Sequence, residues 1–164
     1  MRNFEFIKPQ IKIEQESSNY GKYVVTPLER GYGMTLGNAL RRVLLSSMPG
    51  VAIVAMEVEG VPHEFMAMPG VVEDVTEIIL NLKKLAVKLN GENTKRVIIN
   101  AVGPKEVTAA DIIGDADMEI FNPDLHIATL EEGATLVMEL NLARGRGYVP
   151  AEQNKTDSTP ISVI

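Results

Sequence analysis

The clearest helical pattern in the sequence lies between residues 70 and 85. Apolar residues recur there at intervals of three and four, which places them on one face of an α-helix. The residues of this face are Val71, Val75, Ile78, Ile79, Leu82 and Leu85. Glu73 and Asp74 stand in the first turn, and Lys83 and Lys84 in the last, as the helix dipole favours. The pattern predicts an amphipathic helix with one buried face.

A second helix is predicted over residues 36–47, before Pro49-Gly50, which cannot continue a helix. Thr35 is the expected N-cap, because its hydroxyl can accept a hydrogen bond from an otherwise unpaired backbone N–H. One side is an apolar stripe, which we interpret as facing the core: Leu36, Ala39, Leu40, Val43, Leu44 and Ser47. The opposite side carries Asn38, Arg41, Arg42 and Leu45. A leucine flanked by two arginines is unusual on a purely structural helix, so this side is interpreted as a protein-contact surface.

Alternating apolar and polar residues predict strands over most of the remaining chain. The predicted strands are residues 4–14 (interrupted at Pro9), 20–26, 52–59, 63–68, 97–99, 116–120, 125–130 and 134–142. In the 52–59 strand, one face is expected to carry Ala52, Val54, Met56 and Val58. Two helices with about eight strands make the predicted fold class α+β. The apolar residues 161–164 suggest the start of another strand, so we expect the natural protein to continue.

Composition narrows the class of protein. The chain has 164 residues, of which 45% are hydrophobic and 23% charged, as in a globular protein. It has no cysteine, so nothing suggests disulfides or thiolate metal sites. No signal peptide or membrane-spanning run is found, which favours a cytoplasmic protein. The net charge of -6 argues against a broad nucleic-acid-binding surface.

Two patterns could support an enzyme. Gly31, Gly33 and Gly37 come close to a dinucleotide-binding loop, but the spacing is wrong, and we interpret them as shaping the turn into the helix. Asp115 and Asp117 would share a face in an extended segment and could bind magnesium. Together with Asp111 and Glu119, they are more typical of a solvated loop and strand edge.

The remaining polar motifs point to no catalytic site. His63 and His126 have no recognisable zinc spacing, so each is interpreted as a structural or surface histidine. Residues 144–148, Arg-Gly-Arg-Gly-Tyr, are interpreted as a basic turn that braces the fold or contacts a partner. The residues alone therefore favour a scaffold or assembly protein. A nucleotide- or metal-dependent enzyme using the glycine turn or the aspartates is the alternative.

Five sequence blocks resemble the N-terminal domain of the bacterial RNA polymerase alpha subunit. They are LERGYGMTLGNALRRVLLSSMPG at 28–50, GVVEDVTEIILNLKKLAVKL at 70–89, GPKEVTAADI at 103–112, NPDLHIATL at 122–130 and RGRGYVPAE at 144–152. The blocks extend over nearly the whole chain and keep the order and spacing of the family.

The resemblance implies two subdomains. Residues 1–50 would be the first half of a dimerisation subdomain, and residues 51–164 a mostly β insert subdomain. The family's return segment, which completes the dimer interface, and its DNA-binding C-terminal domain have no counterpart here. The resemblance therefore implies dimerisation only in part, and no direct DNA binding by this chain.

The resemblance also implies an assembly role in transcription. An alpha homodimer recruits the beta subunit and then beta prime, and the nucleotidyl-transfer site lies on those large subunits. This chain would thus carry no catalytic, cofactor-binding or metal-binding residues. In the family, the arginine that matches Arg42 is central to the contact with beta, and the leucine that matches Leu45 is nearby. The resemblance therefore implies a beta-binding role for Arg42 and Leu45, with Arg41 and Asn38 on the same face. The family position that matches Lys83 is tied to assembly with a large subunit, so the resemblance implies such a contact for Lys83.

Overall fold

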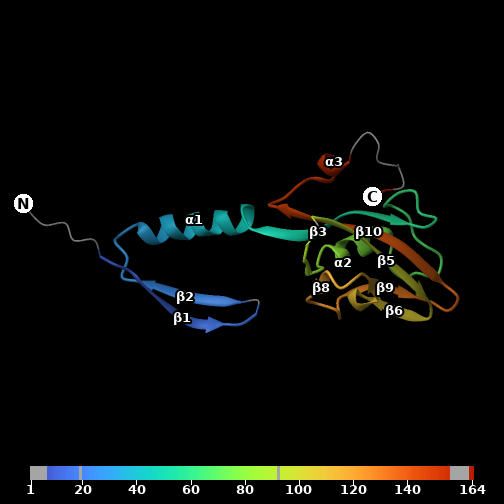
Figure 1. Ribbon diagram of the computed structural model, residues 1–164, viewed down its shortest axis with the longest axis horizontal. Coiled ribbons are helices and arrows are strands. Elements are labelled where there is room, and N and C mark those ends of the chain that lie inside the picture. The colour runs from blue at the N-terminus through green and yellow to red at the C-terminus, as the bar shows by residue number, and fades with distance from the viewer. Residues whose placement is uncertain (1–6, 19, 92, 156–162) are drawn as a thin grey trace, which may run out of the picture. The chain divides into compact units, whose positions relative to one another are not determined.

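The computed structural model describes residues 7–18, 20–91, 93–155 and 163–164. The chain divides into two compact units, residues 1–47 and 48–164 (Figure 1). The described residues form ten β-strands, three α-helices and one short 3₁₀ helix. The predicted α+β fold class is confirmed.

The first unit contains a two-stranded ribbon and a helix. Strands β1 (Gln10–Glu16) and β2 (Gly21–Thr26) pair antiparallel, and α1 spans Tyr32–Ser46. The ribbon has an irregularity between Ile13 and Gln15. The part of the first predicted strand at residues 4–6 lies outside the described residues.

Helix α1 starts three residues before the predicted Thr35 N-cap, so that prediction is wrong. Gly31 is the N-cap, with φ of 91°, a left-handed conformation that glycine adopts without steric cost. This conformation turns the chain directly into the helix at Tyr32 and leaves Thr35 within it. Ser47 is the C-cap, so the helix ends before Pro49 as predicted.

The second unit is built around a four-stranded antiparallel sheet in the order β3-β10-β5-β7 (Figure 1). Its elements are β3 (Pro49–Val58), α2 (Val75–Leu82), β4 (Val87–Leu89), β5 (Thr94–Val102), β6 (Lys105–Thr108), β7 (Ile112–Ile113), β8 (Met118–Ile120), β9 (His126–Leu130), β10 (Thr135–Arg146) and α3 (Ala151–Asn154). The 3₁₀ helix covers Ala109–Asp111. Strands β4 and β8 form one antiparallel ribbon, and β6 and β9 form another.

One hydrophobic core holds this unit together. Helix α2 is shorter than predicted, because Val71 bridges to Leu130 and Asp74 caps the helix at Val75, so Val71 and Leu85 lie outside it. The helix contributes Val75, Ile78 and Leu82, which are buried. Strand β10 contributes alternate residues, all buried as its periodicity predicts: Leu136, Met138, Leu140 and Leu142. No polar or charged residue is buried in the described parts of the chain.

Strand β3 departs from the predicted alternation. Val54 has no partner in β10, because Ala55 pairs with Asn141 and Ile53 pairs with Leu142. The extra residue is a β-bulge, which reverses the faces of the strand before and after it. Met56 and Val58 are therefore buried while Ala52 and Val54 are exposed, and the expectation that all four share one face is wrong.

Two further predictions are corrected by the backbone. Residues 63–68 are irregular rather than a strand, because after the Gly60 turn only Val61 forms a bridge, to Val58. Residues 144–146 are not a turn but the end of β10, paired with the first residues of β3. The turn comes at Gly147, with φ of 73°.

The other predicted strands are confirmed with shifted ends, and three short strands were not predicted. Strands β4, β6 and β7 are two to four residues long, too short for alternation to identify. Ile161 and Ser162 lie outside the described residues. Ile164 exchanges two backbone hydrogen bonds of 2.8 Å with Met56 of β3.

Candidate partner-binding surfaces

Helix α1 buries none of its residues. The side chains of its apolar stripe are uncovered, with Leu40 60% exposed and Leu44 63% exposed. The interpretation of this stripe as part of a core within the described chain is therefore wrong. Isolated exposed leucines are ordinary, but a continuous apolar stripe on a soluble helix is typical of a protein-contact surface.

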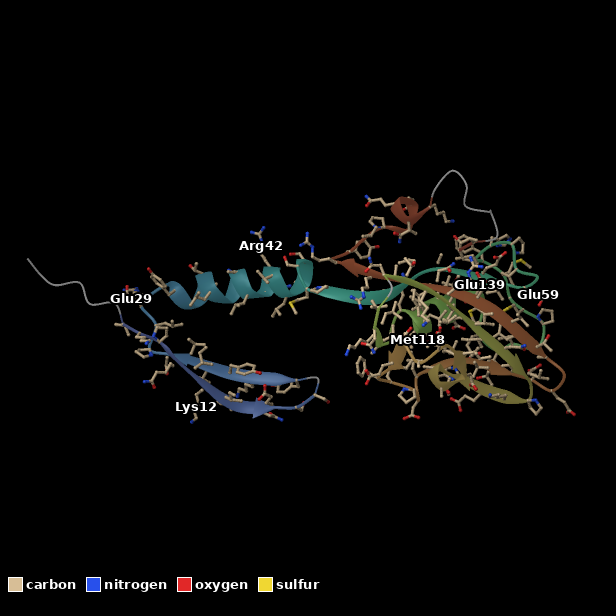
Figure 2. The ribbon with its side chains drawn as sticks, viewed as in Figure 1. Lys12, Glu29, Arg42, Glu59, Met118 and Glu139 are labelled. Carbon is tan, nitrogen blue, oxygen red and sulfur yellow. The ribbon has the colours of Figure 1, made fainter. Side chains whose placement is uncertain are left out.

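The predicted contact residues come together on α1. Asn38, Arg41, Arg42 and Leu45 occupy one side of the helix by their spacing, and Leu45 is 68% exposed. Figure 2 shows the Arg42 side chain projecting outward from the helix. The ion pairs among the described residues include neither Arg41 nor Arg42. Their guanidinium groups can thus meet a partner's carboxylate in a bidentate pair.

The β1–β2 ribbon adds exposed apolar surface to the first unit. Ile11, Ile13, Tyr20 and Tyr23 are all about half exposed or more. The hydroxyl of Tyr23 donates to Glu16 Oε1 at 2.9 Å. That hydrogen bond, with the charge of Glu16 and burial, raises the pKa of Tyr23. The ribbon therefore combines exposed apolar side chains with a side-chain hydrogen bond between its two strands.

Lys83 lies in the other unit, at the C-cap of α2. Its backbone N–H donates to the Ile79 carbonyl at 3.0 Å, which fixes the end of the helix. The side chain is exposed. A lysine at this place also complements the negative end of the helix dipole.

The residues proposed for the enzyme alternative have other structural roles. Gly33 and Gly37 lie inside α1 rather than in a phosphate-binding loop. Asp115 forms an ion pair with Lys95, whose hydrogen bond lowers the pKa of Asp115. Asp115 and Asp117 do line one surface depression, but Lys95 and Arg96 line it with them. The described residues contain no group of three or more histidine, cysteine or acidic residues that could hold a metal ion.

Arg144 braces the second unit. Its Nη2 donates to the backbone carbonyl of Leu89, at the end of β4. This contact agrees with the interpretation of the basic segment as bracing the fold, although the segment is a strand. Tyr148, beyond the strand, is exposed.

Sequence reasoning missed a polar cluster around His126. Its Nε2 lies 2.7 Å from Glu73 Oε1, and its Nδ1 lies 3.0 Å from Glu106 Oε1. The three residues are far apart in sequence, and no spacing rule connects them. His63 has a simpler environment, where its Nδ1 accepts from the Phe65 N–H at 3.3 Å.

The comparisons with known proteins agree with this architecture. The family model of the RNA polymerase Rpb3/RpoA insert domain matches residues 52–164. A DNA-directed RNA polymerase subunit alpha of Symbiobacterium thermophilum is 57% identical over 96% of the chain and 50% of its own length. The subunit of the same name from Alkaliphilus metalliredigens is 56% identical over 98% of the chain and 51% of its length. One from Clostridium botulinum (strain Eklund 17B) is 58% identical over the same shares.

These matches identify the class of protein: subunits of bacterial RNA polymerase. The chain belongs to the family of bacterial RNA polymerase alpha subunits. It spans about half the length of the relatives that it matches. Among the helices of the described ranges, none is long and apolar enough to cross a membrane.

Proposed function

We propose that this chain is a non-catalytic assembly part of a DNA-directed RNA polymerase, acting in the cytoplasm. It pairs with a second alpha subunit as a homodimer scaffold, which recruits the beta subunit and then beta prime. The observation that carries this proposal is α1, which is apolar on one side, arginine-rich on the other and buried on neither. A helix of this kind needs partners, and the matched relatives are named as alpha subunits.

The two subdomains divide the work in this proposal. Residues 1–50 are the first half of the dimerisation subdomain, and residues 51–164 the insert subdomain. Two observations support that division: the insert-domain family matches from residue 52 onward, and the compact units divide between Ser47 and Met48.

The chemistry of transcription belongs to other subunits in this proposal. The chain carries no catalytic, cofactor-binding or metal-binding residue of its own, and it does not bind DNA directly. The ion pairs of Asp111 with Lys105 and of Asp115 with Lys95 support this, since both carboxylates already have cationic partners. The helical placement of Gly33 and Gly37 supports it further, because a phosphate cradle needs a loop.

The arginine-rich side of α1 is the proposed beta contact. Arg42 is its centre, Leu45 supplies apolar contact, and Arg41 and Asn38 flank them. Lys83 is proposed to contact a large subunit separately. A central interface arginine can cost about 2 kcal/mol or more of binding when truncated, whereas an exposed one usually changes folding stability by within about 0.5 kcal/mol.

The test is co-purification of beta with full-length alpha carrying Arg42→Ala, alongside thermal melts of the variant alone. We expect normal folding and dimerisation with weak recovery of beta. Arg42→Lys separates charge from bidentate geometry, and Arg41→Ala is the neighbouring control on the same helix. Normal recovery of beta with Arg42→Ala, or a large loss of thermal stability, would contradict the assignment of this surface.

A further inference from the structure

The segment before α2 forms an extra strand edge against β9. Glu131 N–H donates to the Gly70 carbonyl at 2.8 Å, and Val72 N–H donates to the Thr129 carbonyl at 3.0 Å. An antiparallel bridge joins Val71 to Leu130. The segment of residues 70–73 therefore lies beside β9, on the edge that β6 does not occupy.

Beyond Val72, the side chain of Glu73 takes the place of the backbone in hydrogen bonding to β9. The chain turns into α2 at Asp74, and the carboxylate of Glu73 accepts the Thr129 N–H at 2.6 Å. Glu73 also accepts from the Thr129 hydroxyl at 3.1 Å. Its side chain is only 14% exposed, so it depends on these hydrogen bonds to offset the cost of leaving water.

His126 joins Glu73 to the neighbouring strand β6. Ile127 has no partner in β6, because Val107 pairs with Ala128 and Thr108 pairs with His126. This bulge places His126 on the same face as Thr129, which pairs with Glu106. Each ring nitrogen then faces a carboxylate oxygen, Glu73 on one side and Glu106 on the other.

Only the imidazolium form satisfies both carboxylates. A neutral imidazole donates from one nitrogen and accepts at the other, whereas the protonated ring donates from both. Loss of the proton would set a nitrogen lone pair against one of the two carboxylates. The hydrogen-bond geometry of this site thus depends directly on a single proton.

We propose that His126 is a proton-operated latch, which in its charged form holds Glu73 and Glu106 together and fixes residues 70–73 to β9. Loss of the proton loosens this segment, and with it the start of α2. The state of the latch is set by pH in the range where histidine titrates.

The charges around the latch favour the protonated ring. Beyond the two glutamates, α2 presents Glu77 and Lys84 to the same surface depression, and Lys84 donates to Asn81 Oδ1 at 3.2 Å. On β6, Lys105 is engaged by Asp111. Lys84 and Lys105 therefore have partners of their own, and the groups that contact the His126 ring are anionic.

The directions of the pKa shifts define the pH range in which the latch is closed. The hydrogen bond to Glu73 raises the pKa of His126 above 6.5, against burial and with help from Glu106. For Glu73, burial opposes ionisation, but the Thr129 and His126 hydrogen bonds outweigh it and lower its pKa below 4.5. The stabilisation by His126 is full below pH 6.5 and is lost as pH rises through the raised pKa. The stabilisation by Glu73 is lost as pH falls through its lowered pKa.

The test combines NMR titration of the histidines with amide hydrogen exchange of the whole chain from pH 5.5 to 8.5. His126 should titrate above 6.5, the ordinary pKa of histidine. Protection of the Val72 and Thr129 amides, corrected for intrinsic exchange, should fall as His126 loses its proton. The fall should be about tenfold for each pKa unit that separates the closed latch from the open one. The Ile99 amide in the central sheet should stay better protected than these two amides at every pH, because opening of the segment alone costs less than global unfolding.

Two variants test whether His126 is responsible for the pH dependence. His126→Gln should remove the pH dependence at Val72 and Thr129. Glu106→Gln should lower the pKa of His126, because Glu106 helps to raise it. His63→Gln is the matched control and should leave the exchange pattern unchanged. Should a variant fail to fold, the titration and exchange of the unaltered chain decide the question. A pKa of His126 at or below 6.5, pH-independent protection at Thr129, or protection at Val72 and Thr129 equal to that at Ile99 would each overturn the latch.

Discussion

The start of α2 offers a sharp test of how this unit is stabilised. The helix has eight residues, and Asp74 caps it through a reciprocal pair of hydrogen bonds. Glu77 N–H donates to Asp74 Oδ1 at 2.7 Å, and Asp74 N–H donates to Glu77 Oε2 at 3.3 Å. The substitution Asp74→Ala removes the first bond and leaves a backbone donor at the helix start without its partner.

The expected cost follows from these contacts. Loss of an N-cap acceptor typically costs about 1 kcal/mol, within a range of about 0.5–2 kcal/mol. Loss of negative charge at the helix start adds about 0.3–1 kcal/mol. Val75, the first residue of the helix, is fully buried, so fraying there would also disturb the core. We expect Asp74→Ala to lower the free energy of unfolding by about 1–2 kcal/mol, which corresponds to about 2–8 °C in Tm.

The assay is urea denaturation of the chain at neutral pH with three variants. Asp74→Asn keeps an oxygen acceptor and loses only the charge, so it should retain most of the stability that Asp74→Ala loses. Glu132→Ala removes an exposed carboxylate from a turn and should change stability by within about 0.5 kcal/mol. If Asp74→Ala matched the unaltered chain, or if Asp74→Asn were equally damaging, the capping argument would be refuted.

Two other substitutions test packing and charge. Gly103→Ala should lower the free energy of unfolding, measured in denaturant, by about 1–3 kcal/mol or more, because the new Cβ would overlap the backbone carbonyl of Glu131. Gly145→Ala is the control, since its Cβ would meet open space and the change should be mild. Asp111→Asn should destabilise at neutral pH, because the hydrogen bonds from Lys105 and Thr108 outweigh burial and lower the pKa of Asp111 below 3.8. Since a lowered carboxyl pKa stabilises above the unfolded pKa and is lost on acidification, the two stability curves should converge below pH 3.8. A constant gap down to pH 2 would contradict the ion-pair explanation.

The sequence by itself determined the elements whose pattern is local. The apolar spacing of α2 identified its buried face, and Val75, Ile78 and Leu82 are buried. The alternation in β10 identified Leu136 through Leu142 as core positions for the same reason. In both cases one face packs against the core and the other meets solvent, so apolar residues recur along the sequence with the period of the helix or strand. The fold class follows from the number and type of such elements.

The tertiary structure decided what depends on a neighbouring strand. The bulge at Val54 exists because β10 pairs with Ile53 and Ala55 and passes over the residue between them, and no periodicity within β3 shows that. The end of β10 looked like a glycine-rich basic turn, but pairing with Pro49 and Gly50 keeps it extended. Strand pairing is a long-range interaction, so a local pattern can predict a strand without predicting its register.

The functional residues also fall into two groups, one predictable from local spacing and one that depends on the tertiary structure. Asn38, Arg41, Arg42 and Leu45 were grouped by helical spacing alone, and their role in binding beta stays a prediction, as does that of Lys83. The cluster of Glu73, Glu106 and His126 could not be grouped from the sequence, because its members come from three different elements. The fold brings them together through a bulge and a strand edge. Spacing along one element is set by local geometry, whereas a cluster built across elements exists only once the chain has folded.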